Sequence, residues 1–269
     1  MADHDRLSPF ATNENSFDRV AFLQTVASLS IYKQEALRQF ERNLPNGAMI
    51  LDAGIGTGID LPALERMVGS RGRVIGVDTN QELLDVAQQL CLQENLTRVS
   101  LYDADIHDLP FPDDTFGGVR IDRALQHIVD PQRAIEESYR VLKREGTIEI
   151  CDPDWELLSI SHPDSQLTAR IIEYKREQNI QNGHIARATP TLLQAGFNEI
   201  STIVIEDTFT SPEQVKAFLY LDKLLDDMVR MDVLTQKEAD EWLKQFDQQN
   251  VGNNVLCSFT TAITVGKKQ

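Results

Sequence analysis

The chain alternates short apolar runs with segments in which apolar residues recur every three or four positions. Short apolar runs bounded by turn residues predict buried strands, and the longer period predicts amphipathic helices. Helices are expected after each of the first two strands, at 131–142 and, more briefly, at 190–195. The expected strands are 49–51, 73–78, 98–103, 118–122, 147–151, 200–206 and 255–265. This order is typical of an α/β fold with an open, mostly parallel sheet.

A glycine-rich turn follows the first strand, in the sequence Asp52-Ala-Gly54-Ile-Gly56-Thr-Gly58. Glycines let the backbone pass close to a ligand, and the helix that follows directs its N-terminus at the same place. The spacing differs from the G-x-G-x-x-G of dinucleotide-binding turns. A carboxylate at this position suits a ligand with a free ammonium better than one with a pyrophosphate. Taken alone, the motif also fits an ordinary strand-to-helix turn.

The second strand ends in another acid, Asp78, which lies 20 residues beyond Gly58. That separation is expected for a carboxylate that binds ribose hydroxyls. The next four residues, Thr79 to Glu82, have the form of a capping box, which predicts that a helix begins there.

The run after the third strand is the most specific stretch beyond the glycine turn. Asp105 and Ile106 are followed by D-L-P-F-P-D-D-T-F at 108–116. Together with the glycine turn, this run resembles the D-A-x-x-L-P-F-x-D-x-x-F signature of small-molecule class I S-adenosylmethionine (SAM) dependent methyltransferases, including the ubiquinone/menaquinone group. The motifs cover about 44–150, and the rest of the chain matches only by order of elements. Gly117 departs from the aspartate that the family usually has there.

The resemblance implies that SAM is the cofactor and identifies residues that would bind it. Asp105 would accept a hydrogen bond from the adenine amino group, and the backbone of Ile106 would contact the ring. The cofactor-binding residues implied are Asp52, Gly54, Gly56, Gly58, Asp78, Thr79, Asp105, Ile106 and Asp122.

The resemblance also implies a domain organisation. It predicts a Rossmann-like α/β fold with a seven-stranded, mostly parallel sheet, an antiparallel last strand and a helical cap. The expected divisions are an arm (1–15) and lid helices within 1–44, a core at 45–206, a cap of two helices at 207–250 and a final strand at 251–269. Tyr32 and Phe22 are candidate lid residues, with packing in the core as the alternative for each.

His127 is the candidate catalytic residue. It stands five residues past Asp122, where similar small-molecule methyltransferases often place a histidine facing the acceptor. Imidazole titrates near neutrality, so it is suited to accept a proton as the methyl group arrives. The alternative is that His127 caps or packs against the following helix.

Residues 152–155, Asp-Pro-Asp-Trp, faintly resemble the [DNS]-P-P-[aromatic] motif of enzymes that methylate nitrogens. That motif belongs after the fourth strand, whereas these residues follow the fifth. We therefore interpret 152–155 as a loop at the carboxyl end of the fifth strand, where open α/β sheets place substrates.

The composition of the chain limits the classes of partner and the location that we expect for the protein. The formal net charge of −16 argues against nucleic acid, whose binding normally calls for a clustered basic surface. Cys91, Cys151 and Cys257 are far apart and odd in number, so neither disulfides nor a metal site is predicted, and a cytoplasmic location fits. The first residues are polar and acidic, unlike a signal peptide. No apolar run approaches the ~18 residues that a membrane span needs.

The family resemblance implies an enzyme that moves a methyl group from SAM by in-line displacement, and the expected apolar cap suggests a small, partly hydrophobic metabolite as acceptor. One alternative is an enzyme that binds SAM without consuming it, such as a cyclase. Another is a macromolecule methyltransferase or a cofactor-binding partner protein, and the acidic charge counts against the methyltransferase. The sequence leaves open whether the acceptor atom is oxygen, nitrogen or carbon.

Overall fold

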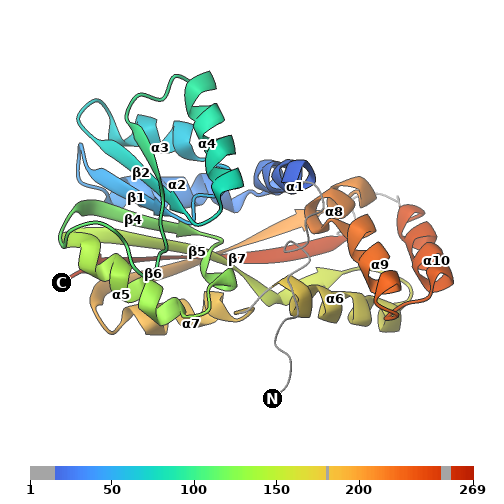
Figure 1. Cartoon of the computed structure of the whole chain (residues 1–269). Helices are drawn as coiled ribbons and strands as arrows, with labels where there is room; N and C mark the ends of the chain where they lie inside the picture. The colour runs from blue at the N-terminus through green and yellow to red at the C-terminus, as the bar shows by residue number, and fades with distance from the viewer. Residues whose placement is uncertain (1–15, 180–181, 250–255) are drawn as a thin grey trace, which may run out of the picture. The chain divides into compact units, whose positions relative to one another are not determined.

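A computed structural model describes residues 16–179, 182–249 and 256–269. Its seven-stranded mixed sheet has the order β3-β2-β1-β4-β5-β7-β6, with β7 antiparallel, which confirms the expected fold class (Figure 1). The expected arm (1–15) and residue 255 lie outside the described residues. The strands are β1 (Met49–Ala53), β2 (Arg73–Asp78), β3 (Val99–Asp103), β4 (Phe116–Asp122), β5 (Leu142–Ile160), β6 (Phe197–Phe209) and β7 (Cys257–Lys268).

The helices connect and flank these strands. None of those in the described part of the chain is long and apolar enough to cross a membrane. The helices are α1 (Ser16–Leu29), α2 (Tyr32–Asn43), α3 (Leu61–Val68), α4 (Gln81–Gln93), the 3-10 helix η1 (Leu125–His127), α5 (Pro131–Val141), α6 (Ser165–Asn179), α7 (Ile185–Leu193), α8 (Pro212–Leu219), α9 (Leu221–Arg230) and α10 (Gln236–Asp247).

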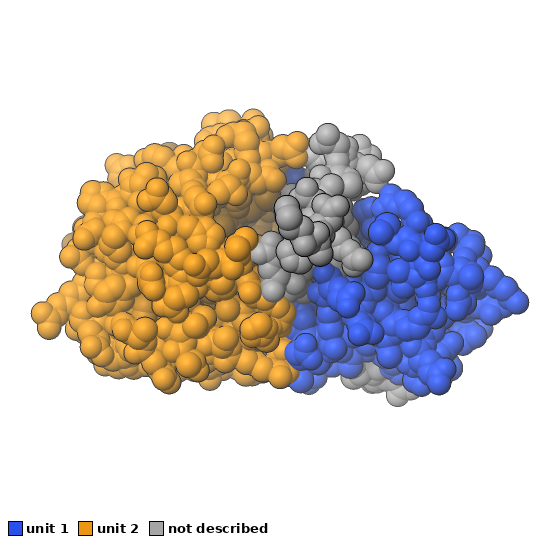
Figure 2. Space-filling view, turned by 60° about the horizontal axis from the view of Figure 1, so that its bottom comes forward, with its two compact units in different colours: residues 1–30, 155–181, 206–260 blue, residues 31–154, 182–205, 261–269 orange. Residues whose placement is uncertain are grey.

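The chain divides into two compact units (Figure 2). It passes from one unit to the other within β5, β6 and β7. Every predicted site residue belongs to unit 2. Unit 1 comprises 1–30, 155–181 and 206–260, and unit 2 comprises 31–154, 182–205 and 261–269.

Alternation along the strands of unit 2 produces a core on each face of its sheet. Ile50 of β1 packs among residues of α2, α3 and α4, whereas its neighbour Leu51 packs among residues of α5 and α7. Successive strand residues point to opposite faces, so two adjacent apolar residues serve two cores. Figure 1 shows α3 and α4 on one side of the sheet and α5 and α7 on the other. The parallel strands β1, β2 and β4 are therefore covered on both faces, and their carboxyl ends share one edge.

Unit 1 has its own apolar core, built from α6 and from three helices between β6 and β7. Two helices were expected there, and this expectation was wrong. The apolar stripe of the first is interrupted at Tyr220, which has a left-handed backbone with φ of 53° and separates α8 from α9. Val215 and Leu224, on either side of the break, are both buried in the same core. Both helices bury an apolar face, so the apolar periodicity continues across Tyr220. The sequence pattern therefore gives no sign of the break.

Residues 152–155 lie inside β5 and not in a loop, which corrects the expectation for this stretch. The pairing of β5 with β4 ends at Cys151 opposite Asp122. Beyond that pair β4 no longer flanks the strand, so Pro153, which has no backbone N–H, is tolerated there. The strand also begins earlier than expected, at Leu142.

Helix α7 begins at Ile185, five residues before the expected start at Pro190. Ile185 and Ala186 are buried, and they give the preceding turn an apolar face. That burial outweighs the hydrogen bond that Pro190 cannot donate inside the helix.

Candidate active site

The glycine turn between β1 and α3 is tightly built at its ends and open in its middle. The backbone N–H groups of Gly54 and Ile55 donate to the Val77 carbonyl at 2.8 and 3.0 Å. A Cβ at Gly54 would stand 2.6 Å from that of Ala124, and the glycine has a φ of 76°. At Gly56, with φ of 56°, a Cβ would meet no described atom within 4 Å. The turn therefore leaves room for a ligand against the backbone of Gly56.

Asp78, at the end of β2, holds this turn. One carboxylate oxygen accepts from the Gly56 N–H at 2.8 Å, and the other accepts from the Asn80 N–H at 2.9 Å. A carboxylate has about four acceptor positions, so two bonds leave capacity for hydroxyl groups of a ligand. The exposed Thr79 lies between these residues. The helix cap is Asn80, whose side chain accepts from Leu83 N at 3.1 Å, so the expected cap was one residue too early.

Asp105 and Ile106 follow the end of β3. The Asp105 carboxylate accepts from the His107 N–H at 2.9 Å and lies 2.7 Å from His107 Nδ1. The backbone hydrogen bond, followed by the ring contact, lowers the pKa of Asp105 below its ordinary value. The Asp105 side chain is 57% exposed, whereas Ile106 is buried in the core. An exposed acceptor beside a buried anchor is compatible with the predicted binding of adenine.

The 108–116 run is fixed by two residues of α5 that the sequence reasoning missed. Glu137 accepts from the Leu109 N–H at 3.0 Å. Arg140 donates to the carbonyls of Leu109 and Phe111 at 2.9 and 2.7 Å. The two side chains also pair with each other at 2.7 Å. These contacts fix the backbone of the loop that follows Asp105.

Arg120, inside β4, is the centre of a buried ionic network. Its terminal guanidinium nitrogens lie 3.3 Å from Asp52, 3.0 Å from Asp60 and 2.9 Å from Asp122. Its Nε lies 3.4 Å from a carboxyl oxygen of Glu149, a fully buried residue of β5. A planar guanidinium with five donors is suited to contact several carboxylates at once.

The start of α2 joins the same network. The Tyr32 hydroxyl donates to Asp122 at 2.8 Å, and the Lys33 ammonium lies 2.7 Å from Asp60 and 2.5 Å from Asp122. Tyr32 is wholly buried, as the packing alternative predicted, while Phe22 belongs to unit 1 and stacks on Tyr220. We use the term charge cluster for Lys33, Asp52, Asp60, Arg120, Asp122 and Glu149.

Burial and pairing perturb the titration of the cluster. Burial, partly offset by Arg120, raises the pKa of Asp52 to about 6 and that of Glu149 to about 8. Burial alone would also raise the pKa of Asp122, but Lys33 and Arg120 together hold it well below its ordinary value. Among the carboxyl groups of the charge cluster, burial therefore raises the pKa of Glu149 the furthest, to above neutral pH. Perturbed groups of this kind concentrate at functional sites.

Hydrogen bonds from β5 and from the segment before α7 hold the turn that carries His127. Asp152 accepts from the Gln126 N–H at 3.3 Å, and the Asn182 side chain donates to the Leu125 carbonyl at 3.1 Å. His127 is exposed at the end of η1. Asp152 is buried, and burial raises its pKa well above the ordinary value. The arrangement holds the histidine at a strand end while leaving its ring accessible.

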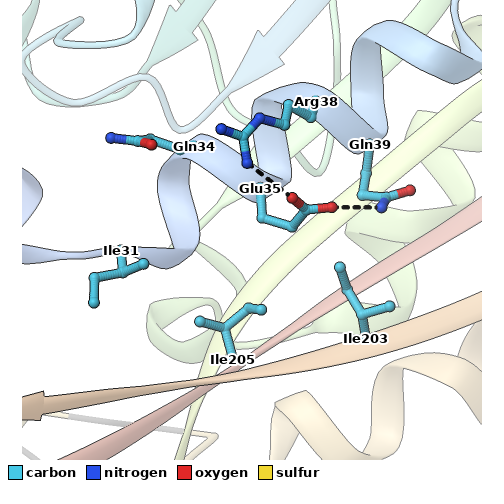
Figure 3. Close-up of a pocket in the computed structure, with 7 residues that line it drawn as sticks. All are labelled: Ile31, Gln34, Glu35, Arg38, Gln39, Ile203 and Ile205. Atoms are coloured by element: carbon cyan, nitrogen blue, oxygen red, sulfur yellow. Dashed lines mark hydrogen bonds and ion pairs between the residues drawn. The ribbon is translucent and has the colours of Figure 1, made fainter.

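A pocket of about 410 Å³ on another part of unit 2 contains none of the predicted site residues. It lies between α2 and β6, lined by Ile31 and Ile203 among others, with Glu35 bridging Arg38 and Gln39 (Figure 3). It is thus separate from the glycine turn, and it does not supply the candidate site.

The structure brings the predicted residues of β1, β2 and β4 to neighbouring strand ends. Sequence reasoning missed four members of the charge cluster: Lys33, Asp60, Arg120 and Glu149. A signal was present for two of them, because Arg120 and Glu149 each interrupt an apolar strand, in V-R-I and I-E-I. A charge inside a strand buried on both faces requires a partner.

Comparison with known proteins indicates which family the residues at the carboxyl ends of β1, β2 and β4 resemble. Residues 51–150 match the family model described as "Methyltransferase domain". A 37.1 kDa uncharacterized protein in transposon TN4556 of Streptomyces fradiae is 32% identical over 230 residues, which cover 84% of this chain and 66% of that protein. The ubiquinone/menaquinone biosynthesis C-methyltransferase UbiE of Marinomonas sp. is 38% identical over 128 residues, covering 47% of this chain and 48% of the enzyme.

The fold has solved counterparts. The YcgJ protein of Bacillus subtilis superposes with a TM-score of 0.58 at 17% identity, covering 88% of this chain and 99% of that one. The chain spans about half to two thirds of the length of the curated relatives above. The matched family model, the motifs on which it falls and the strand order show that the chain belongs to the class I SAM-dependent methyltransferases.

Proposed function

We propose that the protein transfers the methyl group of SAM to a small, partly hydrophobic metabolite. The observation that carries the proposal is the meeting of an open glycine turn with Asp78 and Asp122 at neighbouring strand ends. The similarity to an enzyme named for ubiquinone and menaquinone biosynthesis supports an acceptor of this class. The net charge of −16 supports a small molecule over nucleic acid.

The residues present fit SAM. The open space at Gly56 admits a ligand against the backbone, and Asp78 has acceptor capacity for the ribose hydroxyls. Asp105 and Ile106 would hold the adenine, and the acidic groups of the charge cluster suit the ammonium of the cofactor. Bound SAM supplies an activated methyl group on a sulfonium.

The contribution of the chain itself is to hold donor and acceptor in line. Positioning of this kind supplies on the order of 7–11 kcal/mol in favourable cases. The bonds from Asp78 to Gly56 and Asn80 fix the turn before a ligand arrives. A preformed turn limits the ordering that binding would otherwise require.

His127 is the residue to which we assign the acceptor proton. It is exposed on η1, whose backbone Asp152 and Asn182 hold in place, and it follows the strand that ends at Asp122. Neutral imidazole would take the proton that a hydroxyl or acidic carbon loses on methylation.

We also propose that residues 1–30 and 207–250 gate the site. The amphipathic helices α8, α9 and α10 support this idea because a methyl transfer favours a pocket closed to water. Limited proteolysis with and without S-adenosylhomocysteine (SAH) is the test. Slower cutting within these segments in the presence of SAH is expected, and equal cutting in both states would contradict a cofactor-driven gate.

The function is tested by incubating the protein with methyl-labelled SAM and a metabolite extract from the host. Mass spectrometry should find label in a small, partly hydrophobic product and an equal amount of SAH. Glu94→Gln, an exposed change at the far end of α4, is the matched control and should retain the activity.

Two results would overturn the proposal. Conversion of a metabolite without loss of SAM would identify an enzyme that uses the cofactor unconsumed, such as a cyclase. Label found in protein or nucleic acid would identify a macromolecule methyltransferase.

A further inference from the structure

The charge cluster contains more acids than bases. Its two cations, Lys33 and Arg120, face four carboxyl groups, those of Asp52, Asp60, Asp122 and Glu149. Among the described residues, neither carboxyl oxygen of Glu149 has a hydrogen-bond partner. An ionised carboxylate without hydrogen bonds is strongly disfavoured in a buried site, so Glu149 is protonated at neutral pH. Three carboxylates then face two cations, which leaves one excess negative charge.

This excess charge lies at the glycine turn. Asp52 is two residues before Gly54, and Asp60 is two residues after Gly58. The side chains of Asp60 and Asp122 are 12% and 8% exposed, and that of Lys33 is 14% exposed. Low exposure limits screening by water and salt, so the excess charge acts on a ligand bound nearby.

We propose that the charge cluster makes the site prefer SAM to SAH by charge. The inference rests on the proposed function, in which SAM is the substrate and SAH the product. SAM carries a positive sulfonium that SAH lacks, and the two are otherwise alike in the groups they present. One excess negative charge beside the ligand therefore stabilises the substrate complex relative to the product complex. Because the sulfonium charge is lost on methyl transfer, the site binds SAH more weakly than SAM, which favours release of the product.

Two substitutions change the cluster charge by one in opposite directions. Asp60→Asn removes a negative charge and Lys33→Met removes a positive one. The measured quantity is Kd(SAH)/Kd(SAM) at pH 7, obtained by calorimetry for each variant. Contacts that both ligands share cancel in this ratio, so a general loss of affinity does not change it.

The wild-type ratio is expected to exceed one. Asp60→Asn should lower it about ten-fold and Lys33→Met should raise it about ten-fold, each corresponding to about 1.4 kcal/mol. Matched controls are Glu94→Gln and Lys143→Met, exposed charges at the opposite, amino edge of the sheet, which should leave the ratio unchanged. An analogue with a protonated amine in place of the sulfonium should follow SAM in every variant.

The outcomes separate this inference from the proposed function. A ratio that is unchanged in both cluster variants, or that moves in the same direction in both, would overturn selection by charge while leaving SAM as the cofactor. Failure of wild-type protein to bind either ligand would contradict the cofactor assignment itself. Melting curves of the two variants establish that each is folded. If only one variant folds, the direction in which it changes Kd(SAH)/Kd(SAM) still tests the proposal.

Discussion

Replacing the buried Glu149 by glutamine should stabilise the protein at neutral pH. Glu149 is fully buried in β5, its carboxyl oxygens have no hydrogen-bond partner among the described residues, and its nearest charge is Arg120 Nε at 3.4 Å. Glutamine has nearly the same shape and cannot ionise. The change therefore removes a titration while keeping most of the packing.

The magnitude follows from the pKa of Glu149. Burial raises it from 4.5 to about 8, so between these values the folded protein binds a proton that the unfolded chain releases. Stability from this group is fully present below pH 4.5 and is lost as pH rises toward 8. At pH 7 the loss is about 3 kcal/mol, from roughly 1.4 kcal/mol for each pH unit above the unfolded pKa. Glu149→Gln should recover about 1–3 kcal/mol of it, since the new amide also needs partners.

Urea unfolding of wild type and Glu149→Gln at pH 5, 6, 7 and 8 measures this difference. The two proteins should have nearly equal stability at pH 5, and the variant should gain progressively toward pH 8. Glu94→Gln, a change at the exposed C-cap residue of α4, should alter stability by less than about 0.5 kcal/mol at every pH. A stability difference that is independent of pH, or a variant less stable than wild type at pH 8, would refute the reasoning.

Other variants test the catalytic turn and its support. His127→Ala should lower kcat at least about 10²-fold with SAH affinity near wild type, and a variant that keeps its rate would return His127 to a structural role. Asp152→Ala removes the acceptor for the Gln126 N–H and should lower kcat about ten-fold in a protein that retains His127, yet have little further effect in the His127→Ala background. Equal effects of Asp152→Ala in both backgrounds would show that Asp152 does not act through His127.

The sheet of unit 2 was predictable because its signals are local. The run at 73–78 has an apolar centre and an acid at its end, and β2 has the predicted bounds. The glycine turn is likewise predicted from adjacent residues, and Gly54, Gly56 and Gly58 all have a positive φ. The antiparallel β7 followed from the family resemblance and not from the residues themselves, and the strand order was not predicted.

The errors share a different physical cause. Tyr220 adopts a left-handed backbone between α8 and α9, a single-residue event that leaves the apolar period intact. Residues 152–155 carry a proline, which normally argues against a strand, and they are strand only because β4 ends beside them. Both outcomes depend on neighbours that are distant in sequence.

The charge cluster could not be assembled from the sequence for the same reason. Lys33, Asp60, Arg120 and Glu149 lie far apart in the sequence, and the fold links them in a chain of ion pairs with distances of 2.7 to 3.4 Å. The sequence indicates only that a charge inside V-R-I needs compensation, and not which acids provide it. Asp52 and Asp122 were predicted to bind the cofactor. The structure adds that both acids are also paired with Arg120.

The central claim is that SAM binds at the glycine turn with its ribose on Asp78. The most direct measurement is calorimetric titration of SAH into wild type and Asp78→Ala. Because the lost charge-assisted hydrogen bonds are worth roughly 1.5–3 kcal/mol, the variant should bind about ten- to a hundred-fold more weakly. Unchanged affinity in Asp78→Ala, or no binding to the wild-type protein, would contradict the account.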